Sequence, residues 1–133
     1  MEYKNDFIER EVQKIILFLR NIIAKIIQDG NPSIIIQSFD KELKGKLDFG
    51  FYELLELNDE DLKNKIDGVD IIILEDLIKV FYEFNKKEIP TLDANNLKRV
   101  SLFIINEIEM KSLTFSFERE QIKNYFKSKI VNK

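Results

Sequence analysis

The stretch FIEREVQKIILFLRNIIAKIIQ, from Phe7 to Gln28, decides the fold, because its apolar residues follow a helical period throughout. Its main stripe recurs at alternating steps of four and three residues, the spacing of a heptad seam: Ile8, Val12, Ile15, Leu19, Ile22 and Ile26. Three further residues widen this stripe on one side: Ile16, Ile23 and Ile27. The pattern predicts a long first helix that acts as the spine of a helical bundle.

The width of this stripe leaves two arrangements open. A heptad seam spans about 100° or less of a helix surface, so extra apolar width needs a second neighbour. That neighbour is either another helix of the same chain or a second copy of the protein. We predict that other helices of the same chain cover the wide stripe. A homodimer through the first helix is the alternative.

The apolar stretch does not predict a membrane span. A spanning helix needs about 20 apolar residues, and Arg20, Asn21 and Lys25 interrupt this one. The preceding residues are mixed in charge and no small-residue cleavage site follows, so a signal peptide is not expected either. The absence of Cys is compatible with the cytoplasm, which is the location we expect.

The composition indicates one folded domain over residues 1–133. Hydrophobic residues make up 44% and charged residues 34%, the balance of a globular protein. There are only 4 Gly and 2 Pro, which favours long helices over many tight turns. The sequence therefore predicts an all-α fold, a bundle or helical-hairpin array of about five to seven helices with short connections.

Helix boundaries can be predicted from capping residues. A small polar residue before an apolar-periodic segment marks the start of a helix, and these residues have that position: Asp6, Asn31, Asn58, Asp93 and Ser116. Pro32 suits the first helical position after Asn31. Asp29–Gly30 is predicted to end the first helix, with Gly30 in the left-handed conformation.

Charge and residue usage exclude several classes of function. The net charge is -3 and the isoelectric point about 5.2, whereas nucleic-acid binders usually carry a basic excess. Without His and Cys, the chain lacks the ligands of zinc sites and the bases of Ser-His-Asp triads. We therefore expect no metal, no cofactor and no nucleic-acid partner, and we do not expect an enzyme.

Three phrases resemble a known family. They are DFIEREV at Asp6–Val12, FYELLELNDEDL at Phe51–Leu62 and TFSFERE at Thr114–Glu120. The chain resembles small bacterial proteins that carry an all-helical, partly tetratricopeptide-like domain of unknown function. The resemblance implies a helix pair of that type, here at 70–111, and implies no activity. The chain departs from the true tetratricopeptide signature, because it has no Trp.

Five residues are candidate interaction residues. Arg10 and Arg119 each lie one turn into a helix among acidic neighbours, where an arginine either binds an anion or forms an ion pair that orients the helix end. Phe49, Phe51 and Tyr52 surround Gly50 at a break between helices. They either fill the core or form an exposed loop that docks a partner.

Carboxylates and C-terminal lysines offer further candidates. The segment Asp59–Gly68 has acidic residues but fails the calcium-loop spacing, with Lys63 at the fifth position. The pairs Glu75–Asp76 and Glu107–Glu109 would suit acid–base chemistry only in a shared cleft. The run KNYFKSKIVNK combines lysines with aromatics, as single-strand binders do, but Phe126 shares a stripe with Ile122 and Ile130 and is expected in the core.

These observations predict a non-catalytic protein-interaction or structural accessory module with a protein partner. A small inhibitor or immunity-type protein is one alternative, suggested by small size and acidity. A carboxylate-dependent enzyme is the other.

Overall fold

The computed structural model is all-helical, as the sequence predicts. It describes the backbone of residues 2–28 and 30–128, and the side chains from residue 7 onward in those ranges. Within these residues there is no strand. The helices are α1 (Glu2–Ile27), α2 (Pro32–Leu47), α3 (Phe51–Glu56), α4 (Asp59–Ile66), α5 (Ile71–Lys86), α6 (Ala94–Lys111) and α7 (Phe117–Ser128).

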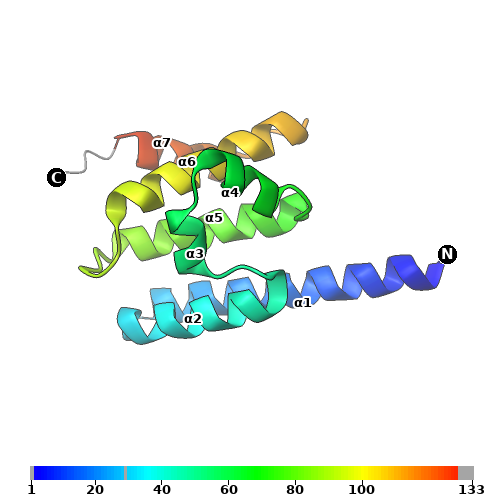
Figure 1. Ribbon diagram of the computed structural model, residues 1–133, viewed down its shortest axis with the longest axis horizontal. Coiled ribbons are helices and arrows are strands. Elements are labelled where there is room, and N and C mark those ends of the chain that lie inside the picture. Colours follow the sequence, from blue (N-terminus) through cyan, green and yellow to red (C-terminus); the bar gives the residue numbers. More distant parts are fainter. Residues whose placement is uncertain (1, 29, 129–133) are drawn as a thin grey trace.

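The helices form three layers with α5 in the middle (Figure 1). α1 and α2 lie antiparallel along one side, and α6 and α7 lie antiparallel along the other. α5 packs against α1, α6 and α7, while the short helices α3 and α4 connect α2 to α5 along the chain and α3 packs against α2 and α6. The central position of α5 makes it the helix that joins the two outer layers.

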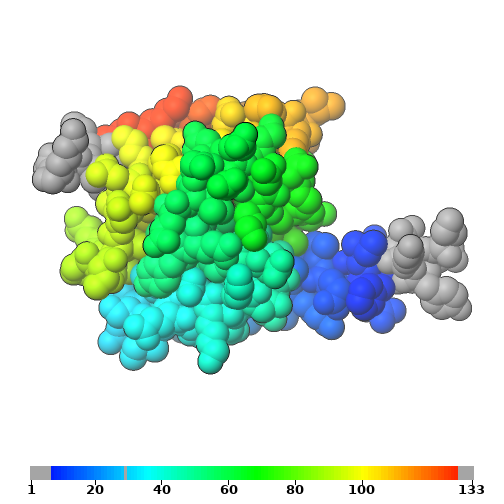
Figure 2. Space-filling model, viewed as in Figure 1, coloured from blue at the N-terminus to red at the C-terminus, as the bar shows by residue number. Residues whose placement is uncertain are grey.

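α1 is the predicted long first helix, and α5 and α2 both cover its apolar stripe. Leu19, Ile22 and Ile26 are buried. Toward the N-terminus the helix runs past the rest of the bundle, as the blue segment of Figure 2 shows, so Phe7 and Ile8 are exposed.

The N-cap predicted at Asp6 is wrong, because Asp6 lies inside α1, which begins at Glu2. No Gly or Pro occurs among residues 2–5 to stop the helix there.

The other predicted caps are confirmed. Backbone N–H groups donate to the Oδ1 atoms of Asn31 (from Ser33, 3.0 Å), Asn58 (from Asp61, 2.8 Å) and Asp93 (from Asn96, 3.0 Å), and to the Ser116 hydroxyl (from Arg119, 3.1 Å). Each bond satisfies a donor that the first helical turn leaves unpaired.

The prediction that Gly30 adopts the left-handed conformation is wrong, because no described glycine has a positive φ. Asp29 lies outside the described residues. Space, rather than a left-handed backbone, favours glycine at position 30. A Cβ there would lie 2.9 Å from the Ile35 Cδ1 atom and 3.3 Å from the Lys25 carbonyl oxygen.

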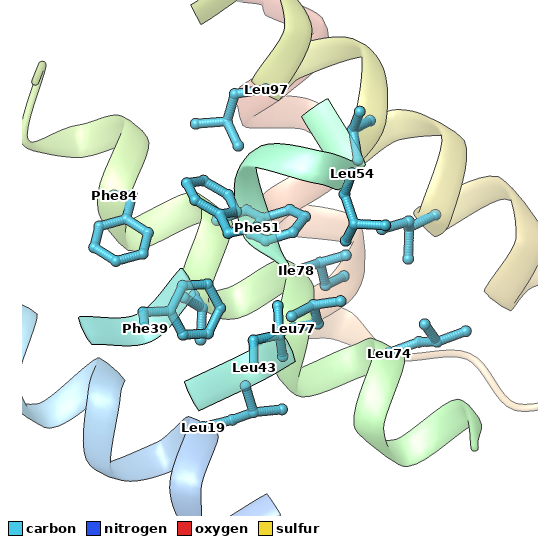
Figure 3. Packing of buried hydrophobic residues seen from close by; sticks show 14 of the residues in the cluster. Leu19, Phe39, Leu43, Phe51, Leu54, Leu74, Leu77, Ile78, Phe84 and Leu97 are labelled. Carbon is cyan, nitrogen blue, oxygen red and sulfur yellow. The ribbon is translucent and has the colours of Figure 1, made fainter. Parts of the chain in front are cut away.

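The core is built around phenylalanines from α2, α3 and α5 (Figure 3). Phe51 lies between Phe39 and Phe84, with ring centroids 5.5 and 5.6 Å away, and contacts Phe81 at 5.1 Å. Such tilted aromatic pairs add about 0.5–1.5 kcal/mol each beyond simple burial. The short helix α3 is therefore anchored by the side chain that begins it.

A carboxylate holds the start of α3. Glu53 accepts a hydrogen bond from the Gly50 backbone N–H at 3.2 Å and forms ion pairs of 3.3 Å with Lys44 and Lys65. The Gly50 hydrogen bond and the two lysines lower the pKa of Glu53 below its usual value. Glu53 thus ties α3 to the ends of both α2 and α4.

Two glycines provide a matched test of this packing. Gly45 lies inside α2, and a Cβ there would meet nothing within 4 Å. We expect Gly45→Ala to raise the free energy of unfolding by about 0.5–1 kcal/mol, because alanine has less backbone entropy to lose in a helix. Gly30→Ala should give no gain, because of the crowding by Ile35. Urea unfolding followed by helical circular dichroism measures both, and equal gains would contradict this account.

Candidate functional site

The connection between α6 and α7, with the helix ends on either side of it, carries a group of exposed apolar side chains. Leu113 is 104% exposed, Phe115 71%, Phe117 70% and Met110 64%. We call these four residues the ridge. Folded monomers seldom expose a contiguous group of large apolar side chains unless it contacts a partner or membrane, so the ridge is a candidate interaction surface.

Arg119 fixes the backbone beneath the ridge. Its guanidinium is 6% exposed and donates to Glu75 Oε2 on α5 at 2.6 Å and to the Thr114 carbonyl oxygen at 2.8 Å. The Ser112 hydroxyl accepts a further bond from the Thr114 N–H at 3.2 Å. The loop is therefore tied to α5 through charge-assisted hydrogen bonds, while its apolar side chains face solvent.

A groove lies at the same end of the molecule. It has a volume of about 800 Å³, between the projecting part of α1, the end of α2 and the α4–α5 connection. Its apolar walls are Ile8, Val12, Leu47, Val69, Ile71 and Ile73. Lys111, the last residue of α6, also lines it and binds Asp67 Oδ1 at 3.2 Å. Because the ridge residues Met110 and Leu113 lie on either side of Lys111 in the sequence, the ridge and the groove are neighbours.

The two arginines predicted as interaction residues have different surroundings. Arg119 forms the buried ion pair that orients the start of α7. Arg10 is exposed on the projecting part of α1, and no ion pair or hydrogen bond joins it to another described residue. The structure does not bring the two side chains into one site.

The predicted aromatic group divides between core and surface. Phe49 and Phe51 are 1% and 0% exposed, so neither presents a surface to a partner. Tyr52 is 37% exposed, and its backbone N–H donates to Asp40 Oδ1 at 3.0 Å. Burial raises the pKa of Tyr52 above its usual value, and the negative charge of Asp40 raises it further.

The carboxylates considered for catalysis form ion pairs with arginine and lysine side chains. Glu75 binds Arg119, while the buried Asp76 binds Arg20 Nε at 3.3 Å and Lys79 Nζ at 3.4 Å. Burial lowers the pKa of Lys79, but Glu118 and Asp76 outweigh it and raise the pKa overall. The neighbours Glu75 and Asp76 thus bind opposite sides of the bundle rather than facing one cleft.

The second carboxylate pair is divided as well. Glu107 is buried with Lys63 Nζ at 3.9 Å, whereas Glu109 binds Lys123 Nζ at 3.0 Å. Asp59–Ile66 is the helix α4, rather than a cation-binding loop. Within the described ranges there is no cluster of three side chains that could hold a metal ion.

The C-terminal lysines do not form a surface with Phe126. This residue is 0% exposed and lies in the core, as predicted, together with Ile122. Ile130 and the last two lysines lie outside the described residues.

The ridge itself was not predicted from the sequence. Its signal is an alternation of large apolar residues with Ser and Thr, SLTFSF at residues 112–117, which includes the α7 cap Ser116. Leu113 and Phe115 precede α7, which begins at Phe117, and Phe117 lies five residues before Ile122 and so on another face of the helix from the Ile122/Phe126 stripe.

Comparison with known proteins gives no match to any family model, curated protein or solved structure. The resemblance seen in the three phrases therefore stays a prediction. No helix within the described residues is long and apolar enough to cross a membrane.

The two arginines provide a matched pair of variants. We expect Arg119→Ala to lower the free energy of unfolding by about 3 kcal/mol, the lower end for breaking a buried ion pair, because Glu75 keeps 21% of its side chain exposed. Arg10→Ala should change it by less than about 0.5 kcal/mol. Urea unfolding measures both, and equal effects would show that Arg119 does not fix the loop.

Proposed function

We propose that the protein is a non-catalytic protein-interaction module and that the ridge is its contact surface. The observation that supports this is an apolar segment that is exposed and also fixed in place. Three of its four side chains are at least 70% exposed. The loop that carries them is bonded to the buried Arg119.

A fixed ridge is suited to binding because little order remains to be gained on contact. Ordering flexible side chains and loops opposes association, and Arg119 has already ordered this loop. Phe115 and Phe117 are aromatic, and buried aromatic anchors tend to dominate binding energy. Because the ridge protrudes, its partner must supply an apolar groove. Burial of each large apolar side chain contributes about 1.5–3 kcal/mol.

The double variant Phe115→Ser/Phe117→Ser tests the proposal. We expect tagged wild-type protein to retain a protein partner when purified from the cells that naturally produce it, and the double variant to lose that partner. The control is Ile27→Ser/Ile34→Ser, which removes two side chains 57% and 64% exposed at the opposite end of the bundle.

This control should retain the partner, because it leaves the ridge intact. Recovery of the same partner by all three proteins would contradict the role of the ridge. Recovery of none by the wild type would contradict the interaction module itself.

Pairing of α1 with a second copy of α1 is a second candidate, favoured by the exposed Leu17 on that helix. The Leu17 side chain is 62% exposed, and it belongs to neither the ridge nor the groove. If two α1 helices pack side by side over this residue, Leu17→Ser should convert a dimer into a monomer. Light scattering measures the mass.

A further inference from the structure

The ridge and the groove lie next to each other at one end of the molecule. Lys111 ends α6, lines the groove and is followed two residues later by Leu113. Figure 1 shows the start of α1, the start of α5 and the end of α6 at this same end. The protruding apolar ridge therefore adjoins a recessed groove with apolar and charged walls at one end of the molecule.

This arrangement is what a twofold dimer needs. In such an interface the same patch of each copy contacts the other, so that if the ridge of one meets the groove of its partner, the reverse contact follows by symmetry. From this geometry we infer that a second copy of the chain binds the ridge, and that each copy inserts Phe115 and Phe117 into the groove of the other. This inference rests on the proposed function of the ridge.

The apolar area at this end is sufficient for a stable dimer. Seven large apolar side chains here are more than half exposed: Phe7, Ile8, Ile72, Met110, Leu113, Phe115 and Phe117. Since a large aromatic side chain covers about 150–250 Å² and an aliphatic one somewhat less, these seven present roughly 800 Å². Complete burial of all seven in both copies would bury at most roughly 1,600 Å², the standard size of a specific interface.

Gly45 offers a way to close the groove without disturbing the fold. It lines the groove, and a Cβ at this position would meet nothing within 4 Å. Gly45→Gln should therefore fill the groove with a flexible side chain that helices accept. It tests the recessed element separately from Phe115→Ser/Phe117→Ser, which removes the protruding one.

The experiment is light scattering across about 1 μM to about 100 μM, a range in which interfaces of this size associate. The wild type should reach twice the monomer mass of 15.8 kDa. Phe115→Ser/Phe117→Ser and Gly45→Gln should each stay at the monomer mass at all concentrations, while Leu17→Ser should still dimerise. Helical circular dichroism and a thermal melt confirm that each variant is folded.

Two results would overturn the inference: a monomeric wild type at the highest concentration, or a dimer that both Gly45→Gln and the ridge variant leave intact, including one that only Leu17→Ser dissociates. The first result leaves the proposed function standing if the wild type retains another protein through the ridge. If the wild type neither dimerises nor retains another protein, the proposed function is contradicted as well.

Discussion

The structure depends on two consecutive carboxylates of the central helix. α5 is apolar on most of its surface, yet Glu75 and Asp76 must each find a cation, because an unpaired buried charge is very unfavourable. Asp76 binds Arg20 of α1, and Glu75 binds Arg119 of α7. Neighbouring residues on a helix point in different directions, so one dipeptide connects the two outer layers through the middle one.

The Glu75–Arg119 pair also determines the state of the α6–α7 connection. A loop with two large apolar side chains, Leu113 and Phe115, would lower its free energy by collapsing onto the bundle. Arg119 prevents this collapse, because its second bond, to the Thr114 carbonyl oxygen, fixes the backbone between Leu113 and Phe115. The exposure of these side chains is therefore maintained by a buried polar contact, which is the reason to regard it as functional.

The sequence predicts local features of this molecule well and non-local ones poorly. Asn31, Asn58, Asp93 and Ser116 cap helices through bonds to residues two or three positions away, so the pattern alone identifies them. Arg119 finds its carboxylate 44 residues away, which no local pattern indicates. Phe115 and Phe117 were missed for a related reason: aromatic residues are core residues by default, and only the packed structure shows that no core position remains for them.

The groove results from a difference in helix length. At a rise of 1.5 Å per residue, α1 is about 39 Å long and α5 about 24 Å, so the longer helix must extend beyond the one it packs on. Its apolar stripe continues into that extension, where Ile8 and Val12 form one wall of the groove. A shorter α1 would fold equally well against α5, but it would have no groove. The extra turns therefore form a wall of the groove rather than part of the core, whereas α5 and its two carboxylates hold the bundle together.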